Sequence, residues 1–195
     1  MKKIFVQKTL KYDPTEYGKY SLYQGYCSSA VQKSNPAICE DIIPHLSSTP
    51  TRIFSSPLLR AKQTTLFFQK KYNVKKIEIV AELSEVIFDL KKLVSETEFE
   101  QQGSFLVRKR FIESFKKDTL AESRYHIQSR LRKVITMFEL LPQGFYLVVT
   151  HSFFMKLMEI YMKEKDIFEN PDLITKFFDV KRRTYEFGEG FSFTL

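Results

Sequence analysis

The chain has 195 residues, of which 43% are hydrophobic and 28% are charged, a balance typical of a soluble globular protein. Its mass of 23.1 kDa fits one domain with a substantial buried core. No apolar run approaches the roughly 20 residues that a membrane span requires, and no signal-peptide core follows Met1. We therefore expect no membrane partner.

The formal net charge of +8 allows an anionic partner but does not name one. Basic residues cluster at 108–110, 116–117, 130–133 and 181–183. Such runs are usually solvated faces, so nucleic acid is kept only as an alternative partner. Two cysteines, Cys27 and Cys39, give no disulfide framework and fit the reducing cytoplasm, where we expect the protein to reside.

Strand-like apolar runs alternate with helix-like periodic segments, which predicts an α/β architecture. In chain order the first half predicts a strand at 3–6, a helix at 36–46, a strand at 52–55, a helix at 58–72, a strand at 77–80 and then the segment Leu83-Ser84-Glu85.

The segment from about 91 to 125 has no strand pattern and is rich in charge and phenylalanine. We interpret it as a helical cap insertion over one end of the sheet. The helix expected from 127 to 141 has apolar residues at helical spacing. The next strand, 145–149, is almost wholly apolar, as in a buried parallel sheet.

A further helix is expected to run to about residue 163, and the tail is interpreted as edge strands at 177–180 and 184–195. Neither repeats nor a low-complexity linker divide the chain. The pattern therefore predicts a single domain over 1–195. We expect a three-layer α/β/α sandwich with a mainly parallel sheet.

The segment from Ser55 to Thr64 takes the chain from a strand into a helix. Ser56 is the expected N-cap and Pro57 the expected first helical residue. A helix N-terminus offers free backbone N–H groups and a positive dipole end to an anion. Arg60, in the first turn, adds a planar fork of donors suited to phosphate.

Four polar residues follow the ends of predicted strands: Lys8, Arg60, Glu85 and His151. Open α/β sheets bind ligands beyond the carboxyl ends of their strands. The four would form a cationic pocket with one carboxylate, suited to holding a phosphoryl group and protonating a leaving oxygen. We find no His, Cys or carboxylate cluster at metal-coordinating spacing and expect neither a metal nor a cofactor.

The chain resembles the histidine phosphatase superfamily, the phosphoglycerate mutase-like phosphatases. The most specific element is Ser-Pro-Leu-x-Arg-Ala-x-Gln-Thr at 56–64. Weaker elements appear in the family's order: Leu22-Tyr23-Gln24-Gly25-Tyr26 through Glu40, Leu83-Ser84-Glu85, Leu120-Ala121-Glu122-Ser123 followed by Arg130, and Val148-Val149-Thr150-His151.

The resemblance implies that the first strand should end in Arg-His-Gly, whose histidine attacks phosphorus. This chain has Gln7-Lys8-Thr9 there, while Arg60, Glu85 and His151 match the second arginine, the acid and the second histidine. Ser152 replaces the usual following glycine. The three histidines are His45, His126 and His151, so no shift of register restores a histidine to the first strand.

Several roles stay open for these residues. Lys8 is interpreted as an anion ligand, with a nucleophilic or a plain surface lysine as alternatives. Glu85 and Arg60 could instead form structural ion pairs, and His151 could be a satisfied core histidine. His126 could approach the pocket from above, whereas His45 is expected at a helix end.

Three functions remain at this stage. The first is a protein without phosphohistidine chemistry that binds a phosphorylated small molecule or a phosphate-bearing macromolecule. The second is an active phosphomonoesterase that uses water or a non-standard nucleophile. The third is a basic interaction module.

Overall fold

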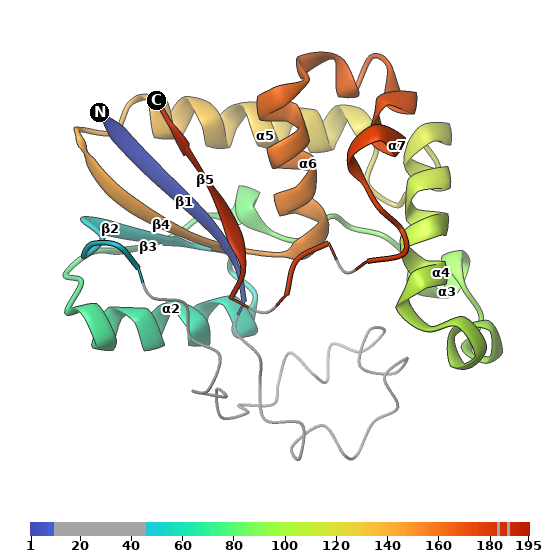
Figure 1. Cartoon of the computed structure of the whole chain (residues 1–195), viewed down its shortest axis with the longest axis horizontal. Helices are drawn as coiled ribbons and strands as arrows, with labels where there is room; N and C mark the ends of the chain where they lie inside the picture. The colour runs from blue at the N-terminus through green and yellow to red at the C-terminus, as the bar shows by residue number, and fades with distance from the viewer. Residues whose placement is uncertain (10–45, 183, 187) are drawn as a thin grey trace.

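The computed structural model describes residues 1–9, 46–182, 184–186 and 188–195, and it contains a five-stranded sheet in the order β3–β2–β4–β1–β5 (Figure 1). The strands are β1 (Lys2–Lys8), β2 (Arg52–Ser55), β3 (Ile77–Ile79), β4 (Gly144–Thr150) and β5 (Gly190–Thr194). β1, β2, β3 and β4 pair in parallel, and β5 pairs antiparallel with β1. The predicted mainly parallel sheet is confirmed.

Helices cover both faces of the sheet, which gives the expected three layers (Figure 1). On one face α2 (Leu59–Tyr72) packs Ala61 and Phe68 against Ile53, Leu147 and Val149. On the other face lie α5 (Arg124–Glu139) and α6 (Ser152–Lys163), which share a larger apolar core with the opposite side chains of β1, β2 and β4. The alternation of side chains along β4 therefore serves two separate cores.

The segment expected as an insertion is helical, with α3 (Leu90–Leu93) and α4 (Glu96–Lys117) to one side of the sheet (Figure 1). Ser95 starts α4 with a capping box, in which its hydroxyl accepts the Glu98 N–H and Glu98 accepts the Ser95 N–H. Gly103, at φ +61°, interrupts the helix. Within the described residues, a short helix, α7 (Ile174–Phe177), and three 3₁₀ turns at 81–83, 165–167 and 171–173 are the other elements.

The tail differs from the prediction. Residues 174–177 form α7, and 178–180 form no strand, so the expected edge strand at 177–180 is wrong. Phe178 instead packs against the rings of Phe111 and Phe153, which explains its apolar character without any sheet. Only Gly190–Thr194 pairs as the expected edge strand. The predicted helix at 36–46 lies outside the described residues, apart from its last residue.

Gly190 is the point where β5 approaches β1 most closely. A Cβ added there would lie 1.9 Å from the backbone oxygen of Val6. Gly190→Ala should therefore break the β1–β5 pairing at Gln7 and cost about 3 kcal/mol of unfolding free energy. Urea denaturation measures this, with the exposed Ser192→Ala as a control that should lose far less. Equal losses in the two variants would contradict the close approach.

Candidate active site

Arg60 and His151 meet at the carboxyl ends of the neighbouring strands β2 and β4. Each strand turns directly into a helix there, with Arg60 in the first turn of α2 and His151 at the N-cap of α6. Arg60 Nε donates to His151 Nδ1 at 3.2 Å, and His151 Nε2 lies 2.8 Å from Ser56 Oγ. The predicted convergence of these two side chains is therefore present in the structure.

The contacts define the protonation of His151. A guanidinium can only donate, so Nδ1 accepts and Nε2 carries the proton that it donates to Ser56. Burial holds the pKa of His151 well below its ordinary value, and the charges of Arg60 and Arg130 lower it further. His151 is thus a neutral imidazole.

Glu85 lies in the segment that follows β3, and its carboxyl contacts the N-terminus of α6. The backbone N–H groups of Phe154 and Phe153 donate to its two oxygens at 2.9 and 3.3 Å, and that of Val86 donates at 3.0 Å. Burial raises the pKa of Glu85, although these donors and the charge of Arg60 oppose the rise. A carboxyl whose pKa is raised is better suited to proton donation than an ordinary one.

Lys8 is the last residue of β1, where it pairs with Thr150. Its Nζ donates to the backbone oxygen of Tyr185 at 2.8 Å, so the C-terminal segment holds its ammonium group. The hydroxyl of Tyr185 in turn donates to Glu159 on α6. Lys8 thus occupies the expected strand end, and its Nζ donates to the tail.

Gln7 precedes Lys8 and is fully buried. Its side-chain nitrogen and oxygen have no hydrogen-bond partner among the described parts of the chain. An unpaired buried amide is costly, on the order of 1–3 kcal/mol. Strand alternation places Gln7 on the same face as Phe5, which packs against the core under α2, the helix that carries Arg60. No local sequence pattern indicates that this amide lacks a partner within the described ranges.

Ser56 acts differently from the prediction. The N-cap of α2 is Leu58, and Pro57 lies before the helix, so the expected cap at Ser56 is wrong. The Ser56 hydroxyl accepts the Leu58 N–H at 3.3 Å and contacts His151. The Ser56 hydroxyl therefore contributes to the site beside His151, a contact that no local pattern could indicate.

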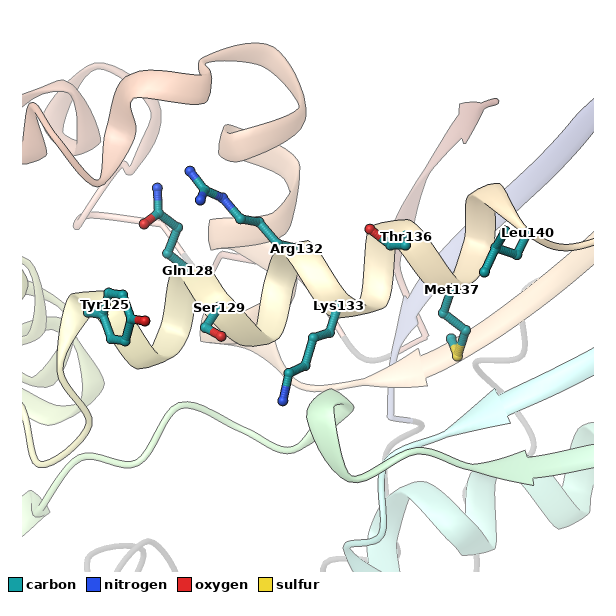
Figure 2. A pocket seen from close by; sticks show the side chains of 8 residues that line it. All are labelled: Tyr125, Gln128, Ser129, Arg132, Lys133, Thr136, Met137 and Leu140. Carbon is teal, nitrogen blue, oxygen red and sulfur yellow. The ribbon is translucent and has the colours of Figure 1, made fainter.

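The structure describes one of the two other candidate histidines. His126 is exposed near the start of α5, and His45 is outside the described residues. A hollow of about 510 Å³ runs along the outer side of α5 and is lined by Tyr125, Gln128, Ser129, Arg132, Lys133, Thr136, Met137 and Leu140 (Figure 2). Arg60, Glu85 and His151 do not line it.

Within the described ranges, no group of three or more His, Cys, Asp or Glu side chains is placed to hold a metal ion. The same ranges contain no helix long and apolar enough to cross a membrane.

The sequence model of the histidine phosphatase superfamily (branch 1) matches residues 39–173, well over half of the chain. The chain belongs to this superfamily. A comparison with curated proteins finds no significant match.

Solved structures share the fold at low sequence identity. Phosphoserine phosphatase from Entamoeba histolytica in complex with 3-phosphoglyceric acid has a TM-score of 0.60 at 14% identity, over 100% of this chain and 91% of that one. A mutant of that enzyme in complex with phosphoserine has a TM-score of 0.55 at 16% identity, over 100% of this chain and 91% of the mutant's chain. Phosphoglycerate mutase from Bacillus anthracis has a TM-score of 0.51 at 16% identity, over 97% of this chain and 86% of the mutase chain.

Proposed function

We propose that this protein binds a phosphorylated ligand at the Arg60–His151 site and lacks the nucleophilic histidine of its superfamily. It would then be impaired as a phosphohistidine-type phosphatase. The observation that carries the proposal is the Arg60–His151 contact at the carboxyl ends of β2 and β4, in a chain with no histidine before position 45. The position that the resemblance assigns to the nucleophile is Lys8.

Two kinds of donor would face a phosphoryl group at this site. Arg60 presents a guanidinium fork and α2 presents its N-terminal N–H groups, while His151 would add an N–H only once its Nδ1 takes up a proton. Arg60 now donates to a neutral imidazole, which is a weaker acceptor than an anion. A phosphoryl oxygen would therefore displace His151 from Arg60 Nε and gain a charge-assisted hydrogen bond.

Lys8 and Glu85 complete the proposed site. Lys8 would add a positive charge from the end of β1, after leaving or sharing its bond to Tyr185. Glu85 would act as a vestigial or residual acid next to the bound group. We further propose that the helical insertion at 91–125, within one domain over 1–195, caps this pocket and selects the ligand.

The ligand class we propose is a phosphorylated small molecule or a phosphate-bearing macromolecule. Support comes from the two similar Entamoeba histolytica structures, whose ligands are phosphoserine and 3-phosphoglyceric acid. No metal or cofactor is part of the proposal. A cytoplasmic location is proposed from the two cysteines alone.

Anion binding tests the proposal directly. We expect inorganic phosphate to bind the wild type, and Arg60→Met to weaken that binding by about 30-fold or more, since hydrogen bonds to charged groups contribute about 1.5–3 kcal/mol. Isothermal titration calorimetry gives both affinities. The matched control is Arg52→Met, which removes an arginine that pairs with Glu78 at the other end of β2 and should leave binding unchanged.

Other outcomes of the same experiments favour the alternative functions. Hydrolysis of p-nitrophenyl phosphate by the wild type, lost in Arg60→Met, would identify an active phosphomonoesterase. Salt-dependent binding of nucleic acid that persists in Arg60→Met would favour a basic interaction module. Absence of phosphate binding by the wild type would overturn the proposed function.

A further inference from the structure

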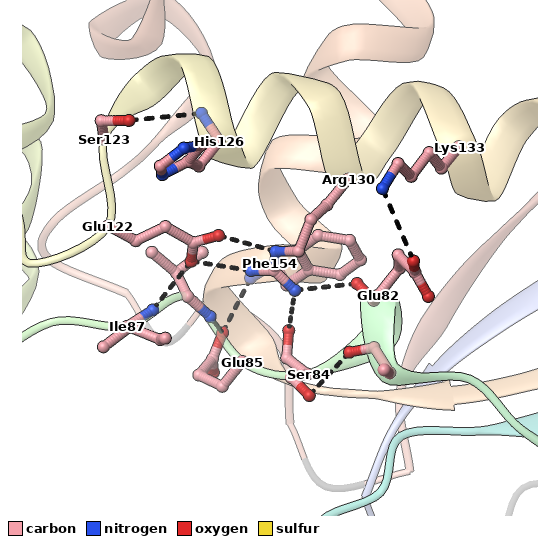
Figure 3. A network of polar contacts seen from close by, with 12 residues as sticks. Glu82, Ser84, Glu85, Ile87, Glu122, Ser123, His126, Arg130, Lys133 and Phe154 are labelled. Carbon is pink, nitrogen blue, oxygen red and sulfur yellow. Dashed lines mark hydrogen bonds and ion pairs between the residues drawn. The ribbon is translucent and has the colours of Figure 1, made fainter.

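Arg130 of α5 and Glu122, which precedes that helix, form a two-pronged ion pair (Figure 3). Arg130 Nε donates to Glu122 Oε1 at 2.7 Å, and Nη2 donates to Oε2 at 2.8 Å. The side chains are only 18% and 8% exposed. A buried ion pair is weak evidence for stability, because the cost of removing both charges from water offsets their attraction. Its two parallel hydrogen bonds nevertheless fix the positions of the two side chains relative to each other.

The pair holds the backbone on both sides of Glu85. Arg130 Nη1 donates to the backbone oxygens of Glu82 and Ser84 at 2.8 and 2.9 Å. Glu122 Oε2 accepts the Ile87 N–H at 3.0 Å, and the Glu122 N–H donates to the Ile87 oxygen at 2.9 Å. The chain is therefore fixed immediately before Glu85 and two residues after it.

The same guanidinium also contacts the helix end that binds the Glu85 carboxyl. It lies over the ring of Phe154, 4.6 Å from the ring centre. The backbone N–H of Phe154 donates to Glu85 Oε1. One ion pair thus touches both the segment that carries Glu85 and the start of α6 that receives its carboxyl (Figure 3).

We propose that Arg130 and Glu122 are positioning residues that hold the Glu85 carboxyl at the N-terminus of α6, beside Arg60 and His151. The use of Glu85 as an acid rests on the proposed function. The position in which Arg130 and Glu122 hold Glu85 does not. Without the pair, the chain around Glu85 would lose three side-chain hydrogen bonds, which are those from Arg130 to the Glu82 and Ser84 oxygens and that from the Ile87 N–H to Glu122. Glu85 would then be free to turn toward water.

Titration of Glu85 tests this role. The variant Arg130→Met/Glu122→Met removes both charges together, so it leaves no unpaired buried ion and no change in net charge. Carbon-detected NMR, with the Glu85 resonance identified by its loss in Glu85→Gln, follows the carboxyl. In the wild type its pKa should lie above the ordinary value, because the group is buried. In the double variant the pKa should fall toward that ordinary value.

A second ion pair provides the matched control. Arg110 binds Glu98 at 2.6 Å and donates to the backbone oxygen of Leu93 at 2.6 Å, so it has the same chemistry on α4. Arg110→Met/Glu98→Met should leave the Glu85 titration at its wild-type position, whatever it does to the melting temperature. Should Arg130→Met/Glu122→Met fail to fold, Arg130→Lys is the second variant and should shift the titration in the same direction.

An unchanged Glu85 titration in a folded Arg130 variant would overturn the positioning role. This outcome is distinct from failure of the proposed function. Phosphate binding decides whether the site takes an anion, whereas the titration reports Glu85 with no ligand present.

Discussion

The variant Gln7→Arg/Lys8→His should gain turnover of p-nitrophenyl phosphate on the order of 10²-fold or more over the wild type, since removal of a nucleophile from a working enzyme costs far more than that. The physical reason is that Arg60 contacts His151 and lies close enough to Glu85 to affect its pKa, so under the proposed function only the attacking group and its arginine have to be restored. The new imidazole at the end of β1 would attack phosphorus, and the ester oxygen would leave with a proton from Glu85.

Two further variants separate this gain from an accidental one. Adding Glu85→Gln to the double variant should lower the new turnover by about 10²–10⁴-fold, the usual contribution of a general acid. Adding Arg60→Met should lower substrate binding as well. Acid-labile phosphate on the protein would identify the phosphohistidine. A double variant that binds phosphate and shows no turnover would mean that Lys8 does not occupy the nucleophile's position.

The end of β4 illustrates what sequence could predict. The run from Phe145 to Val149 is apolar because both faces of the strand are buried, and that property is visible in one sequence. Parallel strands bring their carboxyl ends to one edge, so the meeting of Arg60 and His151 follows from strand order and direction alone. The core of the candidate site was therefore predictable from the sequence.

Contacts to backbone groups were not predictable. Arg130 donates to the backbone carbonyl of Ser84, and Lys8 donates to that of Tyr185. Because every residue has a backbone carbonyl, residue type does not indicate which one will be bound. The sequence predicts a strand at 177–180, whereas Phe178 packs against Phe111 and Phe153, which lie far away in sequence. In each case the decisive partner is distant along the chain and leaves no local signature.

Sulfate binding to the wild type should strengthen as the pH falls. Before an anion binds, His151 is neutral, because burial lowers its pKa and the charges of Arg60 and Arg130 lower it further. A bound dianion raises that pKa by adding negative charge beside the ring. Sulfate affinity should therefore be lowest above the bound-state pKa and highest below the free-state pKa. Between the two it should change by at most about tenfold per pH unit for one proton.

Calorimetry in buffers of different ionisation enthalpy measures the proton taken up with sulfate, which keeps its double charge through this range. Glu85 could contribute in the same direction, because its pKa is already raised by burial and a neighbouring anion would raise it further. The variant Glu85→Gln removes that contribution, so the uptake that remains belongs to His151. In His151→Gln the remaining uptake should come from Glu85 alone. Equal proton uptake by the wild type and His151→Gln would show that the imidazole stays neutral beside the anion. The proposed displacement of His151 from Arg60 would then have to be abandoned.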